Sequence, residues 1–286
     1  MLKRSLILLA ITLCIPLSAL AESLRVSATW LNEHLSKDKL VIIDTRNPED
    51  FEMSHIPGAV NLPDKLTYLN KQENGLIAEP NTIEPLFREK GLDHDSFAVI
   101  YDDGKMIDAA RVFWTLEVYG IQEVRVLDGG FTEWSEKGFK VSDQAIQVKP
   151  SKYVTRVNHR RIASKLSTRL ASMNPRQSVI DARSSKAYRG EVSTAKRYGH
   201  IPSAVNISVH EHFNTKANNA NYLLSLEALK NLYSDVPKSE KVVLYCEVGR
   251  VSTTNYLVLR ELGYDVANYD ASWREWANDF NLPIEK

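Results

Sequence analysis

The sequence predicts two tandem α/β domains, each a parallel β-sheet with helices on both faces. Short apolar stretches typical of buried strands alternate with stretches whose apolar residues recur at helical spacing. This alternation is typical of parallel sheets, because parallel strands need a crossover connection that is usually a helix. The same series of motifs occurs again about 140 residues further along, which is too long for a solenoid unit and indicates a duplicated domain.

The first copy contains four predicted strands. They cover residues 40–44, 97–101 and 124–127, with one more after the turn at 55–61. We expect a helix with a Ser or Thr cap near residue 27, a short helix at Phe51 and a longer helix over 109–119, ended by Gly120. Residues 63–80 are polar and predict a loop.

The second copy repeats these motifs in the same order. The Asp-x-Arg ending of the first strand returns at 181–183, and the His-Ile-Pro turn returns at 200–202. The third strand returns at 242–245, and the last strand with its tryptophan returns at 266–276. A single His-Ile-Pro match would be a weak signal, whereas four motifs in one order, twice, are strong.

Residues 242–252 join a strand, a tight loop and the start of a helix predicted over 253–262. Cys246 ends the strand, and Gly249 and Arg250 lie in the loop. Such a loop directs several N–H groups, and the positive end of the helix, toward one point. A cysteine there is expected to exist partly as the thiolate, its nucleophilic form. The alternative is a buried structural cysteine, because free cysteines are often buried; the glycine turn and Arg250 favour the reactive residue.

This loop resembles the active loop of the rhodanese family of sulfurtransferases. In that family a cysteine opens a loop of six residues with glycine fourth, as in Cys246-Glu247-Val248-Gly249-Arg250-Val251. The resemblance extends over nearly the whole chain after residue 21. It implies a sulfurtransferase in which Cys246 takes a sulfane sulfur from thiosulfate or a similar donor and passes it to cyanide or a thiol, without metal or cofactor. Glu247, Val248, Gly249 and Val251 would line the substrate site.

The two copies differ at the cysteine position. Opposite Tyr245-Cys246, the first copy has Tyr101-Asp102, and therefore no thiol nucleophile. The resemblance implies the same division of labour, with an inactive N-terminal copy and an active C-terminal one. An independent catalytic role for Asp102 is disfavoured, because no partner acid or histidine is visible beside it.

Arg183 and Arg250 are candidates for binding an anionic donor. A guanidinium group can bond two oxygens of an oxyanion at once. Arg183 ends the first strand of the second copy, and the resemblance implies that this position contacts the donor. The alternative for Arg183 is an ion pair with Asp181 or a neighbouring acid. Vertebrate-type thiosulfate enzymes carry two basic residues directly after the cysteine, where this chain has Glu247 and Val248, so the donor stays open.

Three other functions compete with this interpretation. A cysteine phosphatase needs an arginine six positions after its cysteine, where this chain has Ser252. A 3-mercaptopyruvate sulfurtransferase would begin its loop with Cys-Gly-Ser-Gly, which is absent here. A non-catalytic persulfide or redox carrier, or a binding module on the same scaffold, is disfavoured in its pure scaffold form by the presence of Cys246.

Other conspicuous residues predict structure rather than chemistry. His55 and His200 both lie in the repeated turn, and occurrence in the inactive copy favours a structural role. Trp134, Trp273 and Trp276 favour packing over binding.

Composition excludes several classes of partner. Lys+Arg and Asp+Glu number 36 each in 286 residues, so no basic excess suggests nucleic acid. Only one of the 2 cysteines, Cys246, follows the first 21 residues, so the rest of the chain cannot form an internal disulfide.

The first 21 residues predict a secretory signal peptide. Lys3 and Arg4 precede an apolar stretch over 6–17, and Ala19-Leu20-Ala21 supplies small residues at the cleavage site. An uncleaved membrane anchor is disfavoured, because the apolar stretch is short and contains Pro16. We therefore expect a periplasmic or secreted protein without a stable membrane anchor. The expected organisation is a signal peptide at 1–21, an inactive domain at 22–143, a linker at 144–156 and a catalytic domain at 157–286.

Cleavage after Ala21 can be tested directly. N-terminal sequencing of the exported protein should begin at Glu22, because signal peptidase cuts after the small-residue motif. Membrane-bound protein that retains Met1 would contradict the prediction.

Overall fold

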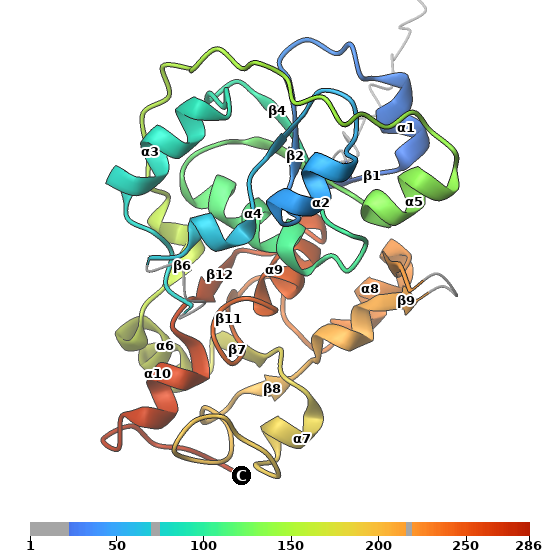
Figure 1. Cartoon of the computed structure of the whole chain (residues 1–286). Coiled ribbons are helices and arrows are strands. Elements are labelled where there is room, and N and C mark those ends of the chain that lie inside the picture. The colour runs from blue at the N-terminus through green and yellow to red at the C-terminus, as the bar shows by residue number, and fades with distance from the viewer. Residues whose placement is uncertain (1–22, 70–74, 216–218) are drawn as a thin grey trace, which may run out of the picture.

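A computed structural model describes residues 23–69, 75–215 and 219–286. It confirms the predicted fold class, with two five-stranded parallel sheets in sequence, each covered by helices (Figure 1). The predicted signal peptide lies outside the described residues. Among the residues described, no helix is long and apolar enough to cross a membrane.

The first sheet has the strand order β1-β5-β4-β2-β3, and all its pairings are parallel. Helices α3 and α4 pack on one face, and α1, α2 and α5 pack on the other. The strands are β1 (Arg25–Val26), β2 (Leu40–Asp44), β3 (Ala59–Asn61), β4 (Phe97–Tyr101) and β5 (Glu123–Leu127). The helices are α1 (Ala28–Glu33), α2 (Pro48–Met53), α3 (Pro80–Glu89), α4 (Ile107–Val118) and α5 (Gly130–Glu136), with a 3-10 turn η1 (Asp64–Thr67).

The second sheet repeats this topology as β6-β12-β11-β7-β8. Helices α8 and α9 cover one face, and α6 and α10 cover the other. The strands are β6 (Ile162–Ala163), β7 (Gln177–Asp181), β8 (Val205–Asn206), β11 (Lys241–Tyr245) and β12 (Val266–Tyr269), besides a separate antiparallel hairpin of β9 (Phe213–Thr215) and β10 (Asn221–Leu223). The helices are α6 (Lys165–Ser172), α7 (Ser185–Tyr188), α8 (Leu226–Leu232), α9 (Ser252–Glu261) and α10 (Ser272–Asn278), with 3-10 turns η2 (His159–Arg161) and η3 (Val209–His212).

Sequence patterning missed some elements. The edge strands β1 and β6 have two residues each, too short for any periodicity. The predicted loop over residues 63–80 was wrong in part, because it contains η1 and a fully buried Tyr68. The segment expected as a linker has no helix or strand, yet Tyr153 within it is buried against the first domain, where Arg88 Nε donates to its carbonyl at 2.7 Å.

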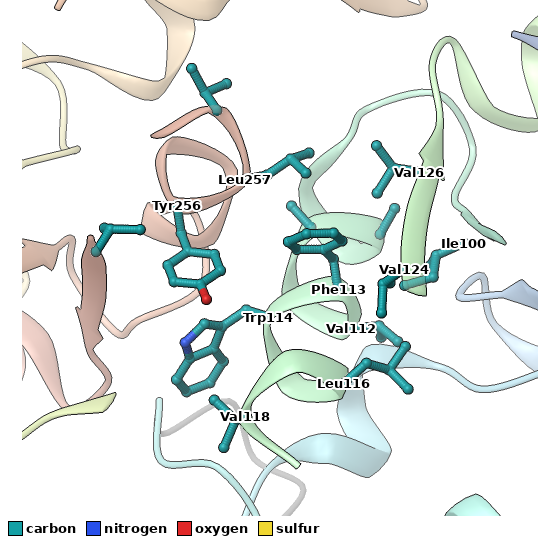
Figure 2. Packing of buried hydrophobic residues seen from close by; sticks show 14 of the residues in the cluster. Ile100, Val112, Phe113, Trp114, Leu116, Val118, Val124, Val126, Tyr256 and Leu257 are labelled. Carbon is teal, nitrogen blue, oxygen red and sulfur yellow. The ribbon is translucent and has the colours of Figure 1, made fainter. Parts of the chain in front are cut away.

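One apolar core joins the two domains. Helices α4 and α9 pack against each other, and Phe113 and Trp114 on α4 face Tyr256 and Leu257 on α9 (Figure 2). The rings of Phe113 and Tyr256 lie 6.3 Å apart between centroids. This cluster continues into both sheets, so the helix that follows the cysteine loop is fixed by the other domain as well as by its own.

Truncating Phe113 should therefore destabilise both domains together. We expect Phe113→Ala to lose about 3–5 kcal/mol of unfolding free energy, because a large buried side chain leaves a cavity. Phe280→Ala is the control, since Phe280 is 68% exposed. Calorimetry should show one transition shifted downward for Phe113→Ala only; loss confined to one of two separate transitions would contradict a shared core.

Candidate active site

Cys246 directly follows β11, the central strand of the second sheet. A short loop then leads into α9, and the cysteine is almost completely buried, with 1% of its surface exposed. Because strand ends of a parallel sheet meet at one edge, the loop lies at the site where ligands bind in such folds.

Several carbonyl groups of the loop are bonded to the residues around it. Cys246 O accepts from Trp273 N and Glu247 O accepts from Arg274 N, each at 3.0 Å, and Arg250 O accepts from Thr253 N at 3.2 Å. All described peptide bonds are trans, so each N–H points opposite to its carbonyl. The N–H groups of residues 247–252 donate no hydrogen bond to any residue that the structure describes. The loop therefore holds a set of unpaired donors on the side away from its bonded carbonyls.

Gly249 makes the tight turn possible. Its φ is +74°, and a Cβ atom there would lie 2.1 Å from the carbonyl oxygen of Asp270. No other residue type fits that approach. The glycine noted in the sequence of this loop thus has a physical cause.

Three polar residues around Cys246 were not found from the sequence. Ser272 Oγ accepts a hydrogen bond from Cys246 N at 3.1 Å. The backbone of Ser272 is left-handed, with a φ of +55°. Ser252 Oγ lies 3.4 Å from Cys246 Sγ and 2.7 Å from Asn268 Oδ1, and either atom could accept its hydrogen bond. A hydroxyl has one proton, so Ser252 can donate to the sulfur or to the amide, but not to both. The sequence signal for Ser252 was its position directly after the six-residue loop that Cys246 opens.

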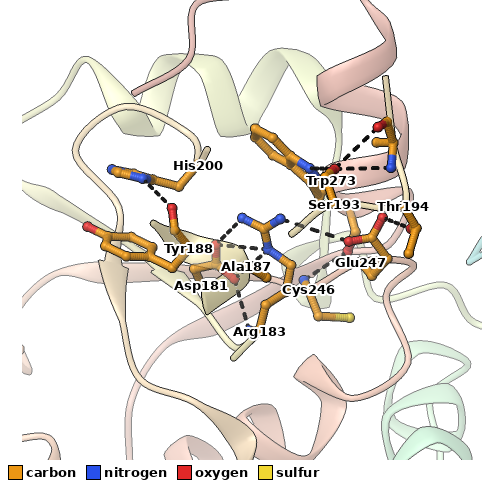
Figure 3. A network of polar contacts seen from close by, with 12 residues as sticks. Asp181, Arg183, Ala187, Tyr188, Ser193, Thr194, His200, Cys246, Glu247 and Trp273 are labelled. Atoms are coloured by element: carbon orange, nitrogen blue, oxygen red, sulfur yellow. Dashed lines mark hydrogen bonds and ion pairs between the residues drawn. The ribbon is translucent and has the colours of Figure 1, made fainter. Parts of the chain in front are cut away.

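Hydrogen bonds hold two of the three guanidinium nitrogens of Arg183 in place. Its Nε and Nη2 donate to the Asp181 carboxylate, with the shortest contact at 2.6 Å, and Nη2 also donates to Gly199 O at 2.8 Å. The guanidinium lies 4.5 Å from the ring centre of Trp273. The ion pair with Asp181, expected as the alternative role, is therefore present (Figure 3). Yet Arg183 Nη1 is buried and has no hydrogen-bond partner among the described residues.

Glu247 faces Arg183 across the loop. Its carboxylate lies 3.9 Å from Arg183 Nη1 and accepts a hydrogen bond from Thr194 (Figure 3). This negative charge lies beside the one unpaired nitrogen, so it opposes the approach of an anion to that nitrogen.

Arg250 is paired with acids of the first domain. Its Nε lies 3.2 Å from Asp64 Oδ2, and its Nη2 contacts Asp108 at the start of α4. These two carboxylates pair with Nε and Nη2, and Nη1 has no partner among the described residues. The predicted role of Arg250 as a donor anchor stays a prediction.

A hollow of about 430 Å³ lies between the domains beside the loop. Arg250, Val251 and Arg183 contribute to its wall from the second domain, and Lys105 and Asp108 contribute from the first. Val248 and Glu247 are not part of this wall. The site expected within one domain thus borders on both.

In the corresponding loop of the first domain, Asp102 stands in the position of Cys246. Phe131 N donates to Asp102 O at 2.8 Å, as Trp273 N does to Cys246 O at 3.0 Å. The Asp102 carboxylate accepts from Gly104 N at 2.8 Å and from Ala109 N at 3.3 Å. Burial raises the pKa of Asp102 to about 6. The counterpart of Gly104 N in the second loop, Val248 N, donates to no described residue, whereas the counterpart of Ala109 N, Thr253 N, donates to Arg250 O.

The repeated histidines and the tryptophans lie in packing positions. His55 Nδ1 contacts Phe51 O at 2.7 Å, and His200 Nδ1 contacts Tyr188 O at 2.9 Å. Trp134, Trp273 and Trp276 are fully buried. In the part of the chain that the structure describes, no cluster of three His, Cys, Asp or Glu side chains could hold a metal ion.

The duplicated fold and the cysteine loop define a two-domain sulfurtransferase of the rhodanese type. A comparison with known families finds the rhodanese-like domain twice, at residues 27–137 and 163–279. The chain belongs to the rhodanese family.

Relatives of similar length share the whole arrangement. A protein of Haloferax volcanii named "Putative thiosulfate sulfurtransferase" is 30% identical over 93% of this chain and 97% of its own. The sulfur carrier protein TtuD of Thermus thermophilus is 29% identical over 91% of this chain and 96% of its own. The 3-mercaptopyruvate sulfurtransferase of Escherichia coli is 27% identical over 91% and 97%.

Solved structures show the same fold. SseA from Escherichia coli, described as a 3-mercaptopyruvate sulfotransferase with the rhodanese fold, superposes with a TM-score of 0.77 at 26% identity, covering 88% of this chain and 99% of that one. EanB superposes with a TM-score of 0.81 at 20% identity over 91% of this chain and 69% of its own, which shows the fold alone.

Replacing the nucleophile should separate the two loops. We expect Cys246→Ser to abolish sulfur transfer, because a serine hydroxyl is not ionised near neutral pH and forms no persulfide. Asp102→Ala should keep activity within about threefold, because Asp102 lies in the loop without a thiol. Steady-state turnover of purified mature protein is the measurement; normal turnover by the serine variant would exclude Cys246 as the nucleophile.

Proposed function

We propose that this sulfurtransferase takes the outer sulfur of thiosulfate, or of a similar sulfane donor, and passes it to cyanide or a thiol. The Cys246 thiolate attacks the outer sulfur, the sulfur–sulfur bond of thiosulfate breaks, and sulfite leaves with the electron pair. The acceptor then attacks the terminal sulfur of the persulfide. The product is thiocyanate or a new persulfide, and the Cys246 thiolate is restored.

The observation that supports this reaction most strongly is the set of unpaired N–H groups in the cysteine loop. The terminal sulfur of a persulfide carries negative charge, and fixed donors stabilise such charge without reorganising. In the corresponding loop of the first domain, the Asp102 carboxylate accepts from Gly104 N and Ala109 N, so backbone donors there face an acidic group.

Arg183 is the better of the two candidates for holding the donor. Its unpaired Nη1 is charged, buried and rigidly placed by the Asp181 clamp and the Trp273 ring. The sulfonate oxygens of thiosulfate are suited to such a donor. Both arginines face two carboxylates: Asp64 and Asp108 lie beside Arg250, and Asp181 and Glu247 lie beside Arg183. The preference for Arg183 therefore rests on its Nη1, which lies 3.9 Å from Glu247 but has no hydrogen-bond partner among the described residues.

Two related functions predict different outcomes in a donor panel. A 3-mercaptopyruvate sulfurtransferase would prefer 3-mercaptopyruvate over thiosulfate. The residues after the cysteine disfavour this function, because Glu247 and Val248 stand where its loop would continue with Gly-Ser. A sulfur carrier would load Cys246 but turn over slowly with small acceptors. Assays of the mature protein with thiosulfate, 3-mercaptopyruvate and an uncharged organic polysulfide, each with cyanide and with a thiol, distinguish the three.

Arg183→Met tests the anchoring of an anionic donor. We expect kcat/KM for thiosulfate to fall by roughly tenfold or more, as for loss of a charge-assisted hydrogen bond of about 1.5–3 kcal/mol. The uncharged polysulfide should be affected much less.

The first domain supplies a matched control for this variant. Arg46 holds the twin position, with Nη2 at 2.6 Å from Asp44 Oδ2 and the guanidinium 3.9 Å from the ring centre of Phe131. Arg46→Met should cost similar stability and leave the kinetics unchanged. Equal losses for both donors in Arg183→Met would mean that Arg183 supports the shape of the loop, and the thiosulfate assignment would lose its main support.

We also propose that the protein works outside the cytoplasm. The basic, apolar and small-residue segments before residue 22 support export. A single cysteine in an exported chain cannot form an intramolecular disulfide, so the Cys246 thiol stays available for transfer.

A further inference from the structure

A buried arginine of the inert first domain reaches the cysteine loop of the second. Arg111 lies on α4 and is fully buried, and its Nη1 donates to Gly249 O at 3.0 Å. The same nitrogen lies 2.6 Å from Asp270 Oδ1. We propose that Arg111 is a positioning residue that sets the orientation of the Gly249–Arg250 peptide, so that the Arg250 N–H faces the sulfur. This inference rests on the proposed persulfide chemistry.

The Gly249–Arg250 peptide could adopt either of two orientations. Glycine adopts both signs of φ readily, so its own conformational preference does not fix the peptide that follows it. If the peptide were reversed, the Gly249 carbonyl oxygen would face the persulfide and repel its charge. External donors must therefore select the productive orientation.

Two side chains supply those donors. Besides Arg111, Asn268 Nδ2 donates to Gly249 O at 3.2 Å. Asn268 is neutral, whereas Arg111 brings a full charge into a site without water contact, where a charge-assisted bond is the stronger one. Loss of Arg111 thus removes the stronger of the two constraints.

Arg111 itself has little freedom to move. Its guanidinium lies 4.4 Å from the ring centre of Tyr68 and 4.6 Å from that of Trp114. Asp270 is buried, follows β12 directly, and also accepts from Ile77 N. The arginine is therefore held from both domains, with its Nη1 fixed at the loop.

In the opposite direction the donor is neutral: Asn221 of the second domain donates from Nδ2 to Lys105 O at 3.2 Å and from its N–H to Gly104 O at 2.8 Å. The loop positions Asp102 and Cys246 correspond, so the residue on α9 that corresponds to Arg111 is Asn255. Asn255 Nδ2 donates to Ile207 O at 2.9 Å, within its own domain. Among the residues that the structure describes, only the loop that carries the thiol has a carbonyl bonded to a charged side chain of the other domain.

Stability alone is a poor explanation for this contact. Burying an ion pair costs desolvation energy that often cancels its attraction, so an apolar contact would hold the domains together at least as well. The contact with the loop carbonyl is what an apolar residue cannot supply.

The test uses the full mature chain and Arg111→Met. Persulfide formation from thiosulfate should slow by about ten- to a hundredfold, somewhat less than the full loss of an oxyanion-hole donor. Alkylation of Cys246 by iodoacetamide should shift to higher pH, because one fewer amide faces the thiolate. This second readout needs no sulfur donor.

Arg25→Met is the matched control. Arg25 also crosses between the domains, with Nε at 2.8 Å from Glu261 Oε2 and Nη1 at 3.1 Å from Leu224 O, but it does not touch the cysteine loop. The Arg25→Met variant should lose about as much stability in thermal unfolding as Arg111→Met. Its transfer rate and its alkylation profile should stay within about twofold of the wild type.

Arg111→Met/Asp270→Asn is measured in parallel, because it leaves no unpaired buried charge should the single variant not fold. The same slower transfer and shifted alkylation are expected. An unchanged alkylation profile in a folded variant would overturn the inference and leave Arg111 as an interface contact. Absence of transfer by the wild type with every donor would instead refute the proposed function, while the alkylation profiles still report on the loop.

Discussion

The outward hydrogen bonding of the loop carbonyls is the constraint on which this site depends. Each carbonyl that is bonded outward leaves its N–H directed inward, because the two groups of a trans peptide oppose each other. Trp273 N and Arg274 N fix the first two peptides after Cys246, and the start of α9 fixes the last ones. The carbonyl of the Gly249–Arg250 peptide is bonded by two side chains, one of them from the other domain.

Duplication gave the protein two such loops, and the two have diverged in complementary ways. In the first loop Asp102 stands at the position of the thiol, and its carboxylate accepts from Gly104 N and Ala109 N. The same domain contributes Asp64, Asp108 and Arg111 to the surroundings of the second loop. The first domain, which we propose to be inactive, therefore contributes to the surroundings of the cysteine loop, and the shared core of α4 and α9 holds it there.

The sequence was sufficient for features that are local or repeated. The strand, glycine turn and helix around Cys246 follow from residues adjacent in the chain, and the duplicated motifs established the fold. The partners of Arg250, the reach of Arg111 and the contact of Asn268 with Gly249 join residues distant in the chain. No periodicity or spacing encodes such contacts. Glu247 was predictable in part: its charge was evident from the sequence, but its position beside Arg183 Nη1 was not.

The central claim is that Cys246 carries the transferred sulfur within this loop. The most direct measurement is mass spectrometry of the protein after reaction with thiosulfate labelled in its outer sulfur. The account predicts that the peptide containing Cys246 gains the mass of one labelled sulfur atom, and that added cyanide removes it as labelled thiocyanate. Continued turnover with Cys246 unmodified at every time point would contradict it.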